Sequence, residues 1–530
     1  MLRTALAAIL FGSVVLLLVR VWFGPIAGLI SARSTLNVEA VAFLAFCGFL
    51  LTSRSSRLSA PLLSQSEATP WVWIAAVALA TSIAFAPSIG FPFLFDDYRH
   101  LMFAFGESPS ALFARVVVHH PTVGDLFFRP LGDFLFEWLY QAFHFDFRLW
   151  HAAGLLLHVA NTLLVVWLAK NISGCWFGAL AGGLFFGWQA SHVEAVSWSS
   201  ALYDLLAAFF VLLALLELIG RRSSVWRYSW LAGLSVLACV SKESSFCLPL
   251  LAAILVALVP AESRTLAAKK ALCVAAACVL VLAYRSWYLQ GLGGYQASAG
   301  GSLAANFRFL SAAQALTLRL WAILFVPLNW SVPPGLALRI AFVCLAGALL
   351  GFAKYGCLAT RRTALLAAFT LCAALPALSL LLIGYDLAGA RVLYLPSAGI
   401  ALLWAEIAES VPNRKHAAGL CALLLAFQLA ALQHNQELWG PVAWTARQAC
   451  IDAGALLRTD PRATVFALNL PRAKNGVYFL QNAFPYCVAA NASVNSFRVS
   501  VGTTLPPAIH PDQWIVTWDD FAGRLVARKP

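Results

Sequence analysis

Two adjacent carboxylates stand at the end of an apolar run in FPFLFDDYRHL, residues 91–101. Asp96 and Asp97 precede Tyr98 and two further ionisable residues, in a chain of which only 11% of residues are charged. The pair fits a hydrated loop, a proton relay, a general base or a site for Mg²⁺ or Mn²⁺. Shielded from water, each carboxylate raises the pKa of the other, which suits a base or a metal ligand. No third carboxylate ligand can be assigned, so metal dependence stays open.

Further ionisable residues recur in short motifs along the chain. They are Arg129 in FRPL, His192 and Glu194 in SHVEAVSW, Asp204 in ALYDLL, Lys242 and Glu243 in SKESS, and Arg391 and Tyr394 in ARVLYLPS. Each has a purely structural explanation: Lys242 and Glu243 could cap helix ends, and Arg391 could reach toward a membrane surface. Ionisable groups near membrane depth are costly, and here several converge on one side. The set therefore predicts an outward-facing active site or a transport pathway.

The composition predicts that the elements positioning these residues are membrane helices. Of 530 residues, 61% are hydrophobic and the mean hydropathy is +0.79, more apolar surface than a soluble protein of this size could bury. Apolar segments of about 18–22 residues suit helices that cross a ~30 Å hydrocarbon core, and the alternation of barrel strands is absent. We predict an all-α polytopic protein with about 13 spans near 4–23, 36–52, 71–90, 148–169, 174–192, 200–219, 228–240, 245–260, 271–288, 336–353, 364–384, 394–409 and 416–433.

Basic residues between the apolar segments predict the orientation, because cytoplasmic loops are enriched in Lys and Arg. The basic groups are Arg54 and Arg57; Arg221, Arg222 and Arg227; Arg264, Lys269 and Lys270; Lys354, Arg361 and Arg362; and Arg414 and Lys415. All five groups lie on one face only if 289–335 stays outside and 311–328 is a re-entrant or surface-lying helix. With a cytoplasmic N-terminus, the loops 91–147 and 289–335 and the tail 434–530 then face outward.

The tail, residues 434–530, is rich in proline and contains β-prone runs such as GVYFL and QWIVTW. We expect a small α/β extracytoplasmic domain preceded by a helix near 440–457. Cys450 and Cys487 could form a disulfide there, while the adjacent Asp519 and Asp520 are interpreted as surface residues.

The net charge of +13 does not indicate nucleic-acid binding. The cations form no continuous stripe and instead sit in short clusters between apolar segments, as topology determinants do. The cysteines lack CxxC spacing, so no zinc site is predicted.

Several of these motifs follow one another in a specific order. FLFDDYRHL, FRPL, HAAGLLLHVANTLL, SHVEAVSWSSALYDLLAAFF, SKESSFCLPL and RVLYLPSAG together resemble the membrane half of the GT-C glycosyltransferases, closest to the TMTC-type O-mannosyltransferases and their bacterial relatives. The resemblance covers roughly 90–435. It implies a catalytic membrane domain at 71–433, preceded by two extra helices in 1–70. Ala390 replaces a usual acidic residue and Leu202 a usual arginine, although Asp204 remains.

The resemblance implies a sugar donor carried on undecaprenyl or dolichyl phosphate and an extracytoplasmic glycolipid, polysaccharide or protein as acceptor. It implies a bacterial inner membrane with the active site toward the periplasm. By position, Asp96 and Asp97 match the catalytic acidic pair, of which the first member is the base in related enzymes. Lys242 and Glu243 match the SKE element, and the pair Arg391 and Tyr394 matches RxLYLPS.

Glycosyl transfer also fits the residue types themselves. A lipid phosphate leaves as a stable anion, so one carboxylate that deprotonates the acceptor hydroxyl is enough, with inversion at the anomeric carbon. Hydrolases instead need two separated carboxylates. Cations must offset the phosphate charge, a role assigned to Arg391, Lys242 and Arg129. The remaining candidates for the substrate pocket are Tyr98, His192, Glu194, Asp204, Glu243 and Tyr394.

Three other functions agree less well with the sequence. A transporter or lipid flippase predicts charges near the midplane, broken helices and paired halves; the sequence shows no such symmetry, and its polar groups sit at one face. An O-antigen ligase or polymerase would favour a long outer loop late in the chain, whereas the acidic loop here comes early. A non-catalytic scaffold leaves the converging charges unexplained.

Overall fold

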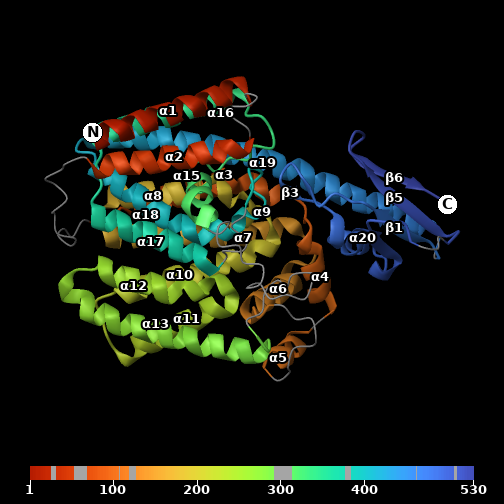
Figure 1. The fold of residues 1–530 in the computed structure, drawn as a ribbon. Helices are drawn as coiled ribbons and strands as arrows, with labels where there is room; N and C mark the ends of the chain where they lie inside the picture. The colour runs from red at the N-terminus through yellow and green to blue at the C-terminus, as the bar shows by residue number, and fades with distance from the viewer. Residues whose placement is uncertain are drawn as a thin grey trace.

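Helices dominate the protein, and a small sheet domain projects from one end of them (Figure 1). The computed structural model describes residues 1–25, 32–52, 68–106, 108–117, 127–291, 313–376, 383–460, 462–506 and 510–529. Within these ranges, nine helical segments are long and apolar enough to cross a membrane. The prediction of a multi-pass helical membrane protein with a small C-terminal α/β unit is confirmed.

Each of the thirteen predicted apolar segments overlaps a helix in its described part; residues 377–382 of the segment predicted near 364–384 lie outside the described ranges. Nine belong to long segments: α1 (Leu2–Phe23), α2 (Ala32–Leu51), α3 (Trp71–Phe85) with η1 (Ala86–Gly90), α7 (Phe147–Ser173), α10 (Leu202–Ile219), α13 (Ala261–Tyr288), α16 (Leu336–Tyr355), α18 (Tyr394–Ser410) and α19 (Arg414–Arg458). Four are shorter: α8 (Trp176–Gly187), α11 (Val225–Ser241), α12 (Leu248–Leu258) and α17 (Thr360–Ala374). At ~1.5 Å per residue, α8 with 12 residues spans only ~18 Å.

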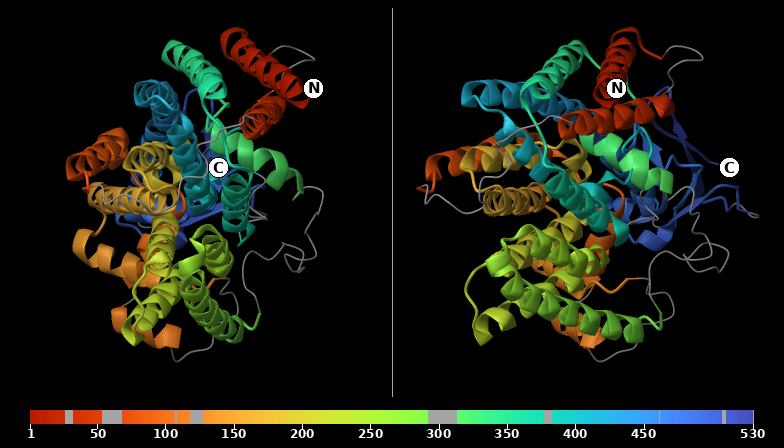
Figure 2. Two further views of the ribbon diagram at one scale, coloured as in Figure 1. Left: turned by 90° about the vertical axis from the view of Figure 1, so that its left-hand side faces the viewer. Right: turned by 60° about the vertical axis from the view of Figure 1, so that its left-hand side comes forward.

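The helices are arranged with α1 and α2 at one edge of the bundle and α12 and α13 at the opposite edge (Figure 2). α1 packs on α2 and α16, whereas α13 packs on α11 and α12. The central helices α7, α8 and α18 contact one another. α18 is the most enclosed of the membrane-length segments within the described ranges, with 94% of its apolar window buried.

The two ends of the bundle differ in charge. One end, here called the acidic-pair end, carries Asp96 and Asp97. α10 starts at this end and its 18 residues extend ~27 Å away from it. At the other end, here the basic end, Arg221 lies 4.0 Å from Glu262 and Arg361 donates to the carbonyl of Ala257 at 2.9 Å. The acidic pair and Arg221 thus lie at opposite ends, as the predicted orientation requires; Arg54 and Arg57 lie outside the described residues.

The connection between α13 and α16 begins and ends at the acidic-pair end. The ring of Tyr288, at the end of α13, lies 5.0 Å from Phe128, and the Trp330 amide donates to the carbonyl of Tyr385 at 2.8 Å. The connection contains a π-helical turn, Ala315–Arg319, and the buried helix α15 (Leu320–Phe325). Much of the predicted re-entrant segment is therefore a short buried helix packed on α2; residues 292–312 lie outside the described ranges.

α19 differs from expectation, because the predicted separate helix near 440–457 continues the last apolar span as one 45-residue helix. The polar triplet at 434–436 resembles a helix boundary in sequence, yet its side chains are buried and bonded to neighbouring backbone. His434 contacts the carbonyl of Asn329, Asn435 donates to Ala190 and Pro327, and Gln436 donates to Ala84. The predicted boundary at 433/434 therefore falls inside a continuous helix.

The C-terminal domain follows α19 and is an α/β unit. Its four-stranded sheet has the order β4-β1-β5-β6 (Val499–Gly502, Thr464–Leu468, Gln513–Asp519, Arg524–Arg528); β1 pairs parallel with β4 and β5, and β5 antiparallel with β6. α20 (Phe484–Ala492) links β1 to β4 and packs on α19. The Cys450–Cys487 disulfide joins these two helices. A separate hairpin, β2 (Ala473–Lys474) and β3 (Val477–Tyr478), turns at Asn475-Gly476 with positive φ at both residues, as expected of this dipeptide.

Small residues allow α8 to approach α18 closely. A Cβ added at Gly182 would lie 2.6 Å from the carbonyl oxygen of Ala401, and one at Gly178 would lie 2.7 Å from that of Ala405. Spacing of four places both glycines on one helix face, the arrangement that lets membrane helices pack backbone to backbone. The buried position of α18, which begins just after Arg391, depends on this contact.

Replacing Gly182 tests the close approach. We expect Gly182→Ala to destabilise the protein by about 1–3 kcal/mol because the backbone of α18 must shift. The control is Gly233→Ala in α11, where an added Cβ meets no atom within 4 Å; it should be neutral or slightly stabilising, since Ala favours helix. Thermal unfolding of both variants in detergent measures the difference, and equal Tm values would contradict the prediction.

Candidate active site

The acidic pair lies at the start of a short helix outside the membrane-length segments. Pro87 lies in η1, which follows α3; residues 91–94 have no regular secondary structure, and α4 (Asp96–Gly106) begins at Asp96. Phe95, immediately before α4, has a φ of +47°, a backbone region that bulky residues rarely occupy. After this sharp turn, the carboxylates of Asp96 and Asp97 have different surroundings.

Asp97 is anchored in the protein interior. One carboxylate oxygen accepts from the Leu94 amide at 3.0 Å; the other accepts from the Ser200 amide at 2.6 Å and its hydroxyl at 2.7 Å. The side chain is 1% exposed, and burial raises its pKa to about 7 against the effect of these hydrogen bonds. The charge of Asp96 adds to that rise as its smallest cause. Asp97 therefore ties the start of α4 to η3 (Ser199–Ala201).

Asp96 differs from its neighbour because no hydrogen bond to its carboxylate is found among the described residues. The side chain is partly exposed, and three cations surround it: Arg391, Arg99 and Arg472. Burial raises the pKa of Asp96, and the three cations oppose that rise. The residue thus combines an accessible carboxylate with a raised proton affinity.

Arg391 is held beside the acidic pair by Glu194. The guanidinium pairs with one carboxylate oxygen of Glu194, whose other oxygen accepts from the Gly389 amide at 2.7 Å. Arg391 lies in η8 (Ala390–Leu393) and Glu194 in α9 (Val193–Ser197), so the ion pair joins two short connecting helices. Burial raises the pKa of Glu194, an effect that Arg391 opposes. The guanidinium also lies 4.4 Å from the ring centroid of Trp198, in cation–π geometry.

Two further ion pairs extend this cluster. The ammonium of Lys242, at the end of α11, lies 2.5 Å from a carboxylate oxygen of Asp204 in the first turn of α10. Arg129, which precedes α6 (Pro130–Phe143), makes a two-bond contact with Glu243, its Nε donating to Oε2 at 2.8 Å. The three ion pairs of the cluster also interact electrostatically with one another; they are Glu194–Arg391, Asp204–Lys242 and Glu243–Arg129. Most of the ionisable motif residues are thus brought together at one end of the bundle.

Three of the residues predicted to line the substrate pocket lie outside this cluster of ion pairs. Tyr98 is buried and bonds to Asn491 of the C-terminal domain, with its pKa raised to about 12 by burial. Tyr394 and His192 are almost fully buried below Arg391. There the Tyr394 hydroxyl lies 2.8 Å from His158 Nδ1, and His192 Nε2 lies 2.7 Å from the Ser397 hydroxyl. These contacts connect α7, η2 and α18 inside the bundle.

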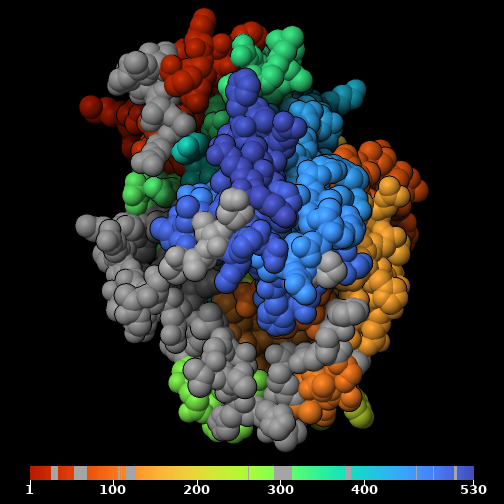
Figure 3. Space-filling model, turned by 90° about the vertical axis from the view of Figure 1, so that its right-hand side faces the viewer, coloured from red at the N-terminus to blue at the C-terminus, as the bar shows by residue number. Residues whose placement is uncertain are grey.

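The C-terminal domain covers much of the acidic-pair end, seen face-on in Figure 3. It contributes a side chain that sequence reasoning missed: the ring of Tyr478 in β3 stacks on Phe95 at 5.2 Å and lies 5.2 Å from Trp198. Ser200 was also missed, although it stands in the recognised stretch SHVEAVSWSSALYDLL. Nothing in the tail marked Tyr478 beyond its β-prone context.

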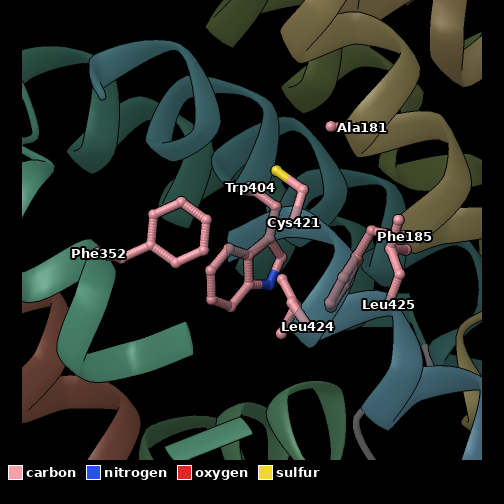
Figure 4. Close-up of a pocket in the computed structure, with 7 residues that line it drawn as sticks. All are labelled: Ala181, Phe185, Phe352, Trp404, Cys421, Leu424 and Leu425. Atoms are coloured by element: carbon pink, nitrogen blue, oxygen red, sulfur yellow. The ribbon is translucent and has the colours of Figure 1, made fainter. Parts of the chain in front are cut away.

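A small apolar pocket lies apart from this cluster, between α8, α16, α18 and α19 (Figure 4). Its lining is Ala181, Phe185, Phe352, Trp404, Cys421, Leu424 and Leu425. Trp404 is 13 residues beyond Arg391, which along a helix is ~20 Å. The lining carries no carboxylate and no basic side chain, so the pocket is not part of the charged site.

The donor set around the acidic pair does not match a divalent-cation site with several protein ligands. Both oxygens of Asp97 already accept hydrogen bonds, which leaves Asp96 as the available carboxylate. Within the described ranges, no group of three or more His, Cys, Asp or Glu residues is placed to hold a metal ion.

Comparison with known proteins gives fold-level matches only. No protein-family model matches the chain, and no curated protein matches it. A crystal structure of ArnT from Cupriavidus metallidurans bound to undecaprenyl phosphate aligns at 15% identity, covering 87% of this chain and 98% of that one, with a TM-score of 0.36. The apo structure of the same enzyme aligns at 15% identity over 86% and 97%, with the same TM-score. Likeness at this level says nothing of what this chain binds or transfers.

The buried Asp97 predicts a pH-dependent stability. Its folded pKa of about 7 lies above its ordinary value of 3.8, so its contribution is fully present below pH ~4 and is lost as the pH rises to ~7. Unfolding free energies of wild type and Asp97→Asn should therefore diverge over this window in favour of the variant, with a limiting slope of about 1.4 kcal/mol per pH unit. Asp512→Asn, at an exposed position, is the control; parallel curves for wild type and Asp97→Asn would contradict the prediction.

Proposed function

We propose that the protein is an inverting glycosyltransferase that moves a sugar from a polyprenyl phosphate to the hydroxyl of an extracytoplasmic acceptor. The observation that carries this proposal is the contrast within the acidic pair. Asp97 is fully hydrogen-bonded, whereas Asp96 presents a carboxylate without a hydrogen bond among the described residues, next to Arg391. Such a carboxylate beside a cation cluster suits a base that acts on a substrate carrying a phosphate.

The reaction follows from these groups. Asp96 accepts the proton of the acceptor hydroxyl while the oxygen of that hydroxyl forms a bond to the anomeric carbon of the donor sugar. The bond from that carbon to the phosphate oxygen breaks on the opposite face, and its electron pair leaves with the polyprenyl phosphate. The configuration is inverted, and no general acid is required because the phosphate is already a weak base.

Asp96 is a better base than Asp97 on two grounds. Its carboxylate is accessible, and proton transfer to it breaks no hydrogen bond among the described residues. A proton on Asp97 would instead have to displace the donors from Leu94 or Ser200. We therefore assign Asp97 to anchoring α4 and Asp96 to proton transfer.

The cations of the cluster would hold the donor phosphate. Arg391 uses one guanidinium nitrogen for Glu194, and its five N–H donors leave others for phosphate oxygens. Lys242 and Arg129 are further from Asp96 along the chain of ion pairs and each is held by a carboxylate. A phosphate entering here adds negative charge to a cluster whose cations are already paired with carboxylates. Because Arg391 is the cation of this cluster beside Asp96, we assign the direct contact with the phosphate to Arg391 first.

The membrane arrangement supports the same proposal. A polyprenyl chain can lie against the apolar helices while its phosphate reaches the end of the bundle where the charges gather. We propose that the acidic-pair end faces the periplasm of a bacterial inner membrane, because Lys and Arg concentrate at the other end. The TMTC-type resemblance makes a mannosyl donor the first sugar to test, on glycolipid, polysaccharide or protein acceptors.

Replacing Asp96 tests the base. We expect Asp96→Asn to lower kcat by about 10²–10⁴-fold, as loss of a general base does, with little change in the donor KM. Wild-type transfer should also fall as the pH drops through the raised pKa of Asp96, because only the ionised carboxylate accepts a proton. The measurement is transfer in vitro from synthetic polyprenyl-phosphate sugars to extracted acceptors, with Asp512→Asn as control.

Full transfer by Asp96→Asn would overturn the assignment of the base. Failure of wild type to transfer any sugar from mannosyl, hexosyl or pentosyl polyprenyl phosphates would count against the proposed function. Repeating the assay after chelation, with and without added Mg²⁺ or Mn²⁺, shows whether a divalent cation takes part.

Replacing Arg391 tests phosphate binding. Arg391→Lys keeps a positive charge beside the buried Glu194 but loses the planar fork that grips phosphate. We expect the donor KM to rise about 10-fold, the equivalent of one charge-assisted hydrogen bond, and the acceptor KM to stay unchanged. Arg362→Lys is a matched control, because Arg362 pairs with Glu406 at the basic end with an N–O distance of 3.1 Å. Equal donor KM values in the two variants would contradict the role.

A further inference from the structure

The side chain proposed to transfer the proton is not fixed by its own contacts. Asp97 is held by three hydrogen bonds, but the Asp96 carboxylate has none among the described residues. Its direction therefore depends on the backbone that precedes it. That backbone is the turn at Phe95, with a φ of +47°.

The turn at Phe95 is strained for an aromatic residue, because the left-handed region brings its Cβ close to backbone oxygen. Such a conformation persists only where the surroundings hold it, and it gathers at functional sites. Phe95 is the only residue with positive φ within the stretch 91–101. What holds the Phe95 ring thus decides whether Asp96 keeps its orientation.

The Phe95 ring is held by the C-terminal domain. It stacks on Tyr478 with ring centroids 5.2 Å apart and an interplanar angle of 27°, and it lies 6.4 Å from Trp198. Tyr478 is in turn 5.2 Å from Trp198, and the Arg391 guanidinium carbon lies 5.8 Å from its ring. One tyrosine of the C-terminal domain therefore touches both the residue before the base and the cation assigned to the phosphate.

The hairpin that carries Tyr478 is fastened to the membrane part of the protein. Asn329 donates from its side-chain amide to the carbonyl of Asn475 at 2.8 Å. Gly476 lies so close to the 384–389 connection that an added Cβ would be 2.2 Å from the carbonyl oxygen of Asp386. A second contact, Tyr98 with Asn491, joins α20 to α4. The C-terminal domain thus contacts the acidic-pair segment at Phe95, just before Asp96 and Asp97, and at Tyr98, just after them.

We propose that Tyr478 is a positioning residue for sugar transfer: by stacking on Phe95 it holds the strained turn that aims Asp96 at the acceptor hydroxyl. This inference rests on the proposed function for its effect on rate. It makes the C-terminal domain a part of the active site. The membrane helices alone would supply Asp96 without a fixed direction.

The test compares Tyr478→Ala, Tyr478→Phe and Tyr486→Ala in the full-length protein. Tyr478→Ala removes the stacking ring and should lower kcat by about 10–100-fold, the effect of a misplaced catalytic group, with a donor KM within about threefold of wild type. Tyr478→Phe keeps the stacking ring and loses only the hydroxyl that bonds Arg391, so its kcat should stay close to that of wild type. Tyr486→Ala removes another partly buried tyrosine of the same domain and should leave kcat unchanged.

Hydrogen–deuterium exchange gives a readout that does not depend on activity. Amides of residues 95–98 should exchange faster in Tyr478→Ala than in wild type or Tyr478→Phe, while those of α7 remain protected. If Tyr478→Ala retains full kcat, or loses it without faster exchange at 95–98, the positioning role is overturned. If Asp96→Asn remains active, or wild type transfers no sugar, the proposed function fails instead, and the exchange comparison still decides whether Tyr478 holds the turn.

Discussion

The site depends on the requirement that charges buried at the ends of membrane helices have partners. An unpaired buried ion is costly, because the lost hydration is not replaced. Glu194, Asp204 and Glu243 are each paired with a cation, and Asp97 is satisfied by hydrogen bonds. With these groups neutralised, Asp96 stands out as the carboxylate of the acidic pair without a hydrogen bond among the described residues.

This requirement also explains where the site lies. The paired residues stand in connecting turns, at helix starts or at helix ends, where backbone polar groups and partial hydration can support a charge. α10 shows the principle: Asp204 occupies its first turn, the middle is apolar, and Glu217 near its end pairs with Arg227 at 2.6 Å. A membrane helix thus separates two charged layers, one associated with the acidic pair and one with the basic loops.

The sequence predicted the helices better than it predicted the contacts between their side chains. Every predicted apolar segment overlaps a helix within the described ranges, since hydrophobic length is a local property, and the ordered motifs contain most of the acids and bases that cluster. The pairings escaped prediction because the partners are 38, 114 and 197 residues apart in the chain. Tyr394 and His192 sit in the same motifs as site residues but turn into the bundle. The continuous α19 was missed because buried Asn435 and Gln436 look like a loop until their backbone partners are known.

The adjacent arrangement of the two aspartates is consistent with the different roles proposed for them. Consecutive side chains on a helix point about 100° apart, so neighbours at the start of α4 cannot both face one ligand. Asp97 points toward Ser200 and anchors the helix, and this leaves Asp96 facing another direction. A pair that flanks a glycosidic bond would instead come from separate positions. Adjacency therefore favours one anchored carboxylate, Asp97, and one that is left without such an anchor, Asp96, as the proposed mechanism requires.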